Sequence, residues 1–181
     1  MSKEMPDNYT VIDIETTGLS PYNDEIIELS GLKVRNNQVV EEFSSLINPR
    51  RDVNEFISSL TGITNTMLKT APELQNILPR FVEFISNDTI LGHNVRFDMS
   101  FIQNKLQKHF NKSLNNKTID TRNIAKAKLN LGSYKLTNIA QQYDINTENN
   151  HRGLKDCYIT YEVYNNLTGR TEPEFIQQSL L

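Results

Sequence analysis

The chain has 181 residues and a mass of 20.9 kDa, a length that fits one domain able to bury its own core. Apolar residues make up 37% and charged residues 23%, so the composition is that of a globular protein, neither disordered nor membrane-spanning. A single cysteine, Cys157, excludes an internal disulfide framework and a cysteine zinc cluster.

The first eight residues are polar and lack the basic and then apolar pattern of a signal peptide. Together with the single cysteine, this favours a cytoplasmic location and no membrane partner. The sequence contains no internal repeat and no linker between domains. We therefore predict a tail over residues 1–8, one domain over residues 9–168 and a C-terminal tail over residues 169–181.

The first part of the domain predicts a strand followed by a hairpin. Tyr9–Glu15 is rich in β-branched residues and ends at turn signals, as expected of a strand. Two further apolar segments, Ile26–Val34 and Val39–Ile47, are joined by Asn36 and Asn37, which indicates a hairpin.

In the second part, helical and strand patterns alternate. A loop at Thr61–Thr64 leads to a short helix. Apolar spacing predicts helices over 72–85, 97–110, 122–129, 136–143 and 151–167, and short strands over 89–91 and 118–120. A hairpin followed by alternating helices and strands predicts an α/β fold, with a mixed central sheet flanked by helices.

Charge is unevenly distributed along the chain. Residues 1–89 carry 14 acidic and 7 basic side chains, whereas residues 90–135 carry 2 acidic and 9 basic ones. A basic segment in an acidic protein suits a polyanionic partner, although solvated helix faces give the same pattern. Lys105, Lys108 and Lys112 are spaced as a stripe on one helix face that could follow phosphates.

Two acidic residues occur close together in the first predicted strand. Asp13 and Glu15 are two residues apart, so they share one face of that strand with Val11. Neighbouring carboxylates that are partly buried repel each other and lose hydration, and a divalent metal would compensate for both effects. If the strand ends at Ile14, both acids are simply solvated.

Three more polar residues lie where ligands bind in α/β proteins. Asp98 follows His93 in the first turn after a short strand, and ligands of such folds bind at strand ends. His151 and Asp156 are five residues apart, so they reach one site only if His151 lies in the loop or first turn of the last helix. Each of the three, taken alone, also fits a surface position.

Three segments resemble the motifs of the DnaQ-like, or DEDDh, 3′–5′ exonucleases. They are Asp13–Leu19, Gly92–Asp98 and His151–Asp156, and the resemblance extends over most of the chain. Within this family, the three motifs are similar to those of the proofreading epsilon subunit and of the exonuclease segment of Gram-positive-type bacterial DNA polymerase III. Gly153 and Cys157 stand where the family often has alanine. The resemblance implies a ribonuclease H-like fold.

The same resemblance implies a two-metal phosphodiesterase. Oxygen-only ligands suit Mg²⁺ or Mn²⁺, so two such ions are the implied cofactors. The implied ligands are Asp13, Glu15, Asp98 and Asp156. His151 is the implied general base, because its ordinary pKa near 6.5 suits proton removal near neutral pH.

The resemblance also assigns contacts with the last nucleotides of a strand. The implied substrate-binding residues are Thr16, Thr17, Gly18, Leu19, Thr61, Gly62, Ile63, His93, Asn94 and Phe97. Phe97 could stack on the penultimate base, or it could belong to the core.

The sequence therefore predicts a metal-dependent exonuclease that hydrolyses phosphodiester bonds at 3′ ends of single-stranded nucleic acid and releases nucleoside 5′-monophosphates. The second motif favours DNA, as in proofreading or repair enzymes. One alternative is an RNA-trimming exoribonuclease of the same family. The other is an inactive module that binds nucleic acid or docks on a polymerase, against which the complete set of five polar motif residues argues.

The C-terminal residues offer one more candidate contact. Gln177–Leu181 resembles the short peptides by which bacterial replication proteins bind the sliding clamp. Leu180 and Leu181 would fill an apolar pocket, and Gln177 would supply a polar contact. The alternative is a frayed terminus. A sliding clamp or a replicative polymerase is thus a predicted partner.

Overall fold

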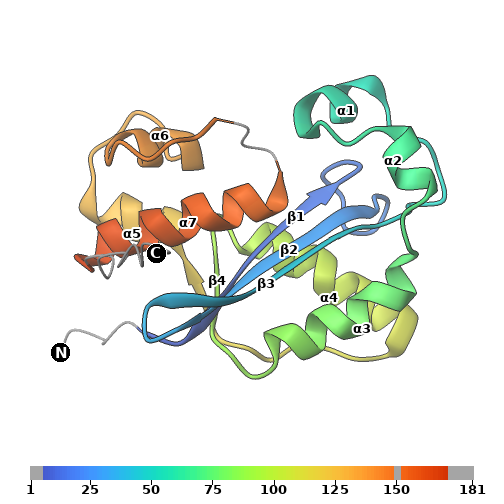
Figure 1. Cartoon of the computed structure of the whole chain (residues 1–181), viewed down its shortest axis with the longest axis horizontal. Coiled ribbons are helices and arrows are strands. Elements are labelled where there is room, and N and C mark those ends of the chain that lie inside the picture. Colours follow the sequence, from blue (N-terminus) through green and yellow to red (C-terminus); the bar gives the residue numbers. More distant parts are fainter. Residues whose placement is uncertain (1–5, 149–151, 171–181) are drawn as a thin grey trace, which may run out of the picture.

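The computed structural model describes residues 6–148 and 152–170, and it forms a mixed five-stranded sheet with helices on both faces (Figure 1). The strands are β1 (Tyr9–Thr16), β2 (Ile26–Arg35), β3 (Gln38–Leu46), β4 (Ile90–Gly92) and β5 (Thr118–Asp120). Their order in the sheet is β3-β2-β1-β4-β5. The first three are antiparallel, whereas β4 is parallel to β1 and β5 to β4. The predicted α/β class and mixed sheet are confirmed.

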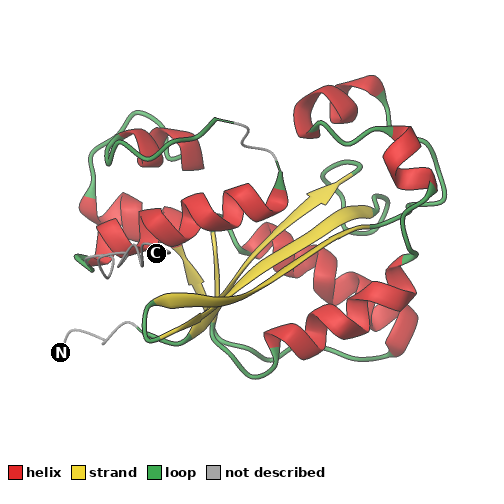
Figure 2. Ribbon diagram, in the orientation of Figure 1, coloured by secondary structure: helices red, strands yellow, loops and turns green. Residues whose placement is uncertain are grey.

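Helices pack against both faces of this sheet (Figure 2). They are α1 (Glu55–Thr61), α2 (Asn65–Lys69), α3 (Leu74–Ile85), α4 (Arg96–Phe110), α5 (Thr121–Lys128), α6 (Leu136–Gln141) and α7 (Gly153–Thr168). Ile12 and Ile14 of β1 join the core cluster formed with α3 and α4. Val11 lies in a second cluster, with residues of α7. The period-two alternation predicted for this strand is therefore present, and the face of Val11 is the one that α7 covers.

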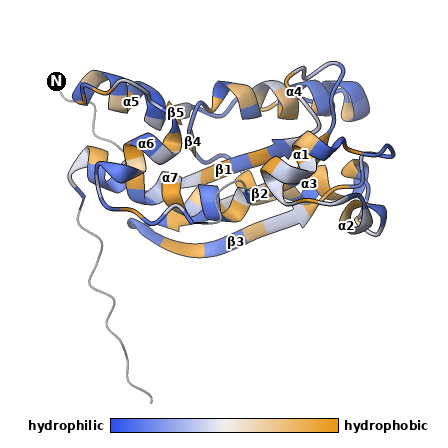
Figure 3. Ribbon diagram, turned by 90° about the horizontal axis from the view of Figure 1, so that it is seen from above, coloured by the Kyte–Doolittle hydropathy of each residue, from blue (hydrophilic) through white to orange (hydrophobic). Residues whose placement is uncertain are grey.

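The same patterning explains why the helices pack where they do. Figure 3 shows hydrophobic and hydrophilic residues alternating along the strands and helices. In α3, six apolar residues three or four positions apart are buried, including Phe81 and Phe84. Burying each large apolar side chain contributes about 1.5–3 kcal/mol, so this face holds α3 against the sheet.

Within the described residues, no helix combines the length and the apolar composition that a membrane span requires.

Helix α1 was not predicted from the sequence. Its caps are clear: the Asn54 side chain accepts a hydrogen bond from the Ile57 amide at 2.9 Å, and Gly62 ends the helix with a φ of 69°. However, only Ile57 and Thr61 of its seven residues are buried, so it has no apolar periodicity. A helix this short is fixed by its caps and its neighbours.

The lysine stripe predicted for α4 is wrong. Lys105 is completely buried, while Lys108 and Lys112 are exposed. Helix α4 ends at Phe110, so Lys112 lies beyond it. Spacing alone predicts which side chains share a face, but packing decides whether that face meets solvent.

Some predicted features lie outside the described residues. They are His151 and the peptide Gln177–Leu181. The regular elements run from Tyr9 to Thr168, and Arg170 contacts both the Pro6 carbonyl at 3.0 Å and Asp7 at 2.9 Å. The two ends of the described chain therefore meet on one side of the molecule.

Candidate active site

Three of the predicted acids meet where β1 ends beneath the first turn of α7. Carboxylate oxygens of Asp13, Glu15 and Asp156 all lie within 4.8 Å of one another. Asp13 and Glu15 face α7 because alternate residues of β1 point to that side of the sheet. Residues 13 and 156 are brought together by tertiary packing, as the motif resemblance implied.

Asp98 approaches the same place from the opposite helix layer. It lies in the first turn of α4, is 5% exposed, and accepts a hydrogen bond from the Ile14 amide at 3.2 Å. This bond fixes Asp98 to the backbone between Asp13 and Glu15. Asp98 is not one of the three acids whose oxygens converge, but it lies beside them.

The acids repel one another strongly. Burial, and then the charges of Asp98 and Asp156, raise the pKa of Asp13 well above its usual range. Burial and the Asp156 charge raise the pKa of Glu15 to about 8, and burial raises the pKa of Asp98 to about 8. A cation bound among them would relieve this repulsion.

A fifth acid, Glu28, for which the motifs gave no role, fixes the start of α7. Glu28 is buried in β2, and its carboxylate accepts hydrogen bonds from the Gly153 amide at 3.0 Å and from Arg152 at 3.3 Å. A Cβ at residue 153 would lie 2.6 Å from the Ser30 hydroxyl. This close approach explains why glycine, and not alanine, stands there. A charged residue inside the apolar segment of β2 was the signal for Glu28 in the sequence.

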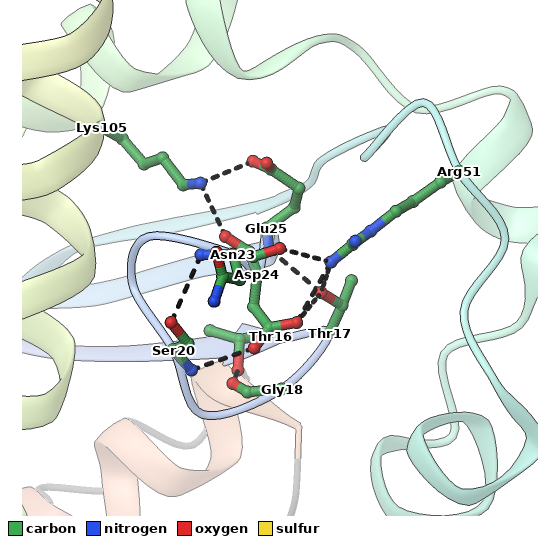
Figure 4. A network of polar contacts seen from close by, with 9 residues as sticks. All are labelled: Thr16, Thr17, Gly18, Ser20, Asn23, Asp24, Glu25, Arg51 and Lys105. Carbon is green, nitrogen blue, oxygen red and sulfur yellow. Dashed lines mark hydrogen bonds and ion pairs between the residues drawn. The ribbon is translucent and has the colours of Figure 1, made fainter.

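The loop after β1 carries the first group of predicted substrate contacts (Figure 4). Thr16 donates a hydrogen bond to the Gly18 carbonyl at 2.6 Å, and the Thr17 amide donates to the Glu25 carbonyl at 2.9 Å. A Cβ at Gly18 would lie 2.5 Å from the Asp24 carboxylate, so a larger residue there would displace this side chain from its hydrogen bonds within the loop. Leu19 is 85% exposed at the tip of this loop.

The second predicted group lies at the end of α1. Thr61 and Ile63 are buried, and the Ile63 side chain lies in a core cluster with α1 and α2. Gly62 is exposed. Leu60, which precedes Thr61, was not among the predicted substrate contacts, but its side chain lines a cleft.

The third group of predicted substrate contacts includes His93, whose two ring nitrogens both make hydrogen bonds within the protein. Burial lowers its pKa, so the ring is neutral near pH 7. We assign its Nε2–H as donor to the Tyr134 carbonyl at 3.1 Å, with Nδ1 accepting from the Thr121 hydroxyl at 2.9 Å. His93 therefore ties β4 to the segments that follow it. This leaves neither ring nitrogen free for a substrate.

The other two residues of this group lie on either side of the α4 start. Asn94 is exposed, and its side chain accepts a hydrogen bond from Arg122 at 3.3 Å. Phe97 is half-buried, with its ring 5.0 Å from that of Phe101. Phe97 thus packs partly against the core and keeps part of its surface accessible.

A cleft of about 630 Å³ opens beside the acids. Its lining includes two cationic side chains, Arg122 and Lys135. The lining residues are Leu60, His93, Asn94, Arg122, Ser133, Tyr134, Lys135, Leu136, Thr137 and Asp156. An anionic ligand in this cleft would therefore lie between cations and the carboxylate of Asp156.

Comparison with known proteins gives consistent relatives. The family model for exonucleases, RNase_T, matches residues 10–164. The DNA polymerase III subunit epsilon of Aquifex aeolicus is 34% identical over 169 residues, which cover 90% of this chain and 84% of that protein. The DNA polymerase III PolC-type of Caldanaerobacter subterraneus subsp. tengcongensis is 37% identical over 157 residues, 86% of this chain. The chain spans only 11% of the length of that PolC-type relative.

Solved structures agree on the fold. Exonuclease X in complex with 5′ overhanging duplex DNA has a TM-score of 0.73 at 22% identity, covering 89% of this chain and 91% of that one. E. coli exonuclease I in complex with a dT13 oligonucleotide has a TM-score of 0.80 at 19% identity, covering 91% and 42%. These likenesses confirm the ribonuclease H-like fold. With the family model and the epsilon subunit matching nearly the whole domain, the chain belongs to the DnaQ-like exonuclease family.

Proposed function

We propose that this chain is a metal-dependent 3′–5′ exonuclease that removes nucleoside 5′-monophosphates from the 3′ ends of single-stranded DNA. The observation that carries the proposal is the meeting of Asp13, Glu15 and Asp156 beside a cleft with cationic walls. Exonuclease I and exonuclease X, which share the fold, have been solved with DNA. Family membership supports the same class of reaction.

The acids fit a pair of Mg²⁺ or Mn²⁺ ions as cofactors. The donor atoms are all carboxylate oxygens, which hard divalent cations prefer, and burial together with neighbouring negative charges raises the pKa values of Asp13 and Glu15. Asp13, Glu15 and Asp156 would hold one ion, and Asp13 with Asp98 the other. When bound, such ions orient a water and neutralise charge on a phosphodiester.

Proton removal and substrate binding would be carried out by the chain's own residues. His151, as the general base that the motif implies, would remove a proton from the attacking water. Thr16, Thr17, Gly18 and Leu19 would hold the terminal nucleotide, partly through backbone groups. Arg122 and Lys135 would attract the phosphates of the preceding nucleotides along the cleft.

The test uses single-stranded oligonucleotides of matched sequence, one of DNA and one of RNA, each labelled at either end. The proposal expects divalent-metal-dependent release of the 3′ label first, with DNA cleaved faster. Faster cleavage of RNA would favour the exoribonuclease alternative. Binding without cleavage in any divalent metal would favour the inactive docking module.

Cellular context belongs to the same proposal. The epsilon and PolC-type relatives are named as parts of DNA polymerase III. We propose that this chain works in the cytoplasm beside a replicative polymerase or a sliding clamp, with Gln177–Leu181 as the candidate docking peptide.

A further inference from the structure

Two cations from distant parts of the chain hold the loop Thr17–Glu25 (Figure 4). Lys105 of α4 places its ammonium 2.6 Å from the Asp24 carbonyl oxygen and 2.8 Å from a carboxylate oxygen of Glu25. Arg51, which follows β3, donates hydrogen bonds to the Thr17 hydroxyl at 2.6 Å and to the Asp24 carboxylate at 3.1 Å. The loop is thus fastened to α4 on one side and to the segment after β3 on the other.

Lys105 is the stronger of the two anchors. Its side chain is 0% exposed, whereas that of Arg51 is 47% exposed. A buried ammonium is costly unless it is paired, and both oxygens that Lys105 contacts belong to the loop. If the loop moved away, Lys105 would lose these contacts. The burial of this lysine therefore favours the position of the loop seen in the structure.

Bonds within the loop make its base a single rigid unit. The Asp24 carboxylate accepts from the Ser20 amide at 3.0 Å and from the Thr17 hydroxyl at 3.2 Å. The Thr17 hydroxyl oxygen in turn accepts from the Glu25 amide at 3.0 Å. The base is fixed while Leu19 at the tip remains 85% exposed.

We propose that Lys105 is a positioning residue that holds the Thr17–Glu25 loop against α4, so that Leu19 is presented in one place to the 3′-terminal nucleotide. This inference rests on the proposed function. Helix α4 also carries Asp98, so one helix positions both an acid of the site and the loop beside it. A loop held in this way binds substrate without first having to be ordered.

The inference predicts a separation between KM and kcat. If the loop is freed and occupies its binding position only part of the time, apparent affinity falls by that fraction, so KM rises. At saturating substrate the loop is ordered again, so kcat is unchanged. A lysine that only stabilised the fold would instead reduce the amount of active enzyme and leave KM unchanged.

The central experiment compares Lys105→Met with Lys108→Met on a single-stranded DNA oligonucleotide. Methionine keeps the apolar stem of lysine without the charge, and Lys108 is an exposed lysine on the same helix. We expect KM to rise about tenfold in Lys105→Met, with kcat within about twofold of wild type. Lys108→Met should change neither constant. Amide hydrogen exchange should become faster in the Thr17–Glu25 loop and not in α3.

Salt dependence separates positioning from direct attraction of phosphates. Because Lys105 is buried, its effect on KM should persist when ionic strength is raised, whereas a surface phosphate contact would be screened. An effect of Lys105→Met that vanished at high salt would overturn the inference. So would an unchanged KM in the folded variant.

Glu25→Gln provides an independent variant if Lys105→Met does not fold. It keeps the size of the side chain but removes the charge that pairs with Lys105. The same rise in KM is expected, and an unchanged KM would overturn the inference. If the wild-type protein cleaves no oligonucleotide, the proposed function fails instead. In that case unchanged loop exchange in the variants would overturn the positioning role separately.

Discussion

At the scale of single residues, the site is a cluster of like charges held together by the fold. Asp13, Glu15 and Asp156 converge within 4.8 Å, and Asp98 is bonded to the backbone between the first two. Such a cluster is destabilising without a cation, because burial and the charges of Asp98 and Asp156 raise the pKa values of Asp13 and Glu15. The same repulsion would favour binding of a divalent metal.

Replacing Asp13 or Asp156 by Asn should therefore separate activity from stability. We expect cleavage to fall by more than about a hundredfold, because a metal ligand is lost. Without metal, the melting temperature should stay equal or rise, because one repelling charge is removed. Asp52→Asn, at an exposed acid, is the control. Either site variant keeping more than about a tenth of wild-type kcat would disprove the metal-ligand assignment.

The same acids should make the metal-free protein less stable as pH rises. The folded pKa values of Glu15 and Asp98 are about 8, above the ordinary 4.5 and 3.8, so the folded state binds more protons in between. The free energy of unfolding should then fall from about pH 4 to about pH 8. The lowered pKa values of His93 and His109 act oppositely below the ordinary 6.5, but these are two groups against three acids with raised pKa values, Asp13, Glu15 and Asp98.

Thermal melts in chelator across this pH range measure the effect. Added Mg²⁺ should raise the melting temperature most near pH 8, where the carboxylates are ionised and free to bind it. Stability that increased steadily with pH in chelator would show that the acids are already compensated within the protein.

At the scale of elements, the start of α7 is set by its contact with β2. The Glu28 carboxylate accepts a hydrogen bond from the Gly153 amide, and the Ser30 side chain leaves no room for a Cβ at residue 153. The first turn of α7 also carries Asp156, so this contact helps to place a site acid. Strand β2 and the first turn of α7 together position one side of the site.

Gly153→Ala should consequently destabilise the protein and reduce activity. The added methyl group would press on Ser30, at a cost of about 1–3 kcal/mol, typical of overpacking. The Ser30 hydroxyl has no hydrogen-bond partner among the described residues, so Ser30→Gly can be combined with it. We expect the double variant to recover part of the melting temperature and of kcat. Failure of Ser30→Gly to improve Gly153→Ala would place the strain elsewhere.

At the scale of the whole molecule, the basic middle of the sequence is spread over separate surfaces. Lys105 is buried, whereas Arg122 and Lys135 line the cleft beside Asp156. Lys117 lines a different pocket, between the end of α3 and the segment before β5. Net charge along the sequence therefore overstates how many cations a bound strand could meet.

Replacing Arg122 and Lys135 by Ala should weaken binding of single-stranded DNA in a salt-dependent manner. The slope of log affinity against log salt should become shallower by about 0.7 for each lost phosphate contact, about 1.4 in all. Lys117→Ala removes a cation away from the cleft and should leave the slope unchanged. Equal slopes in the cleft variant and wild type would mean that the strand takes another path.

Binding of the sliding clamp through the predicted C-terminal peptide is a further prediction for the whole protein. Deleting Gln177–Leu181, which lies outside the described residues, should abolish binding to purified sliding clamp. Cleavage of short free oligonucleotides should remain unchanged, because tethering raises only the local concentration at a primer end. Absence of clamp binding by the full chain at about 100 μM would end this hypothesis.

The sequence by itself determined the features that depend on local pattern. Period-two alternation put Asp13 and Glu15 on one face of β1, and apolar spacing located α3, α4 and α7 within a few residues. Motif order supplied the family, the fold and the acids. The short helix α1 was missed because its caps, with no apolar periodicity between them, fix it.

Only the tertiary structure decided which polar residues meet. Three sets of contacts join residues far apart in the chain. They are the ion pair between Lys105 and Glu25, the hydrogen bond from the Gly153 amide to Glu28, and the hydrogen bonds of the His93 ring. Spacing along one helix or strand carries no information about what packs against it. Those contacts depend on how the layers stack, because a buried ammonium or backbone amide is costly without a partner, and here only the assembled fold supplies one.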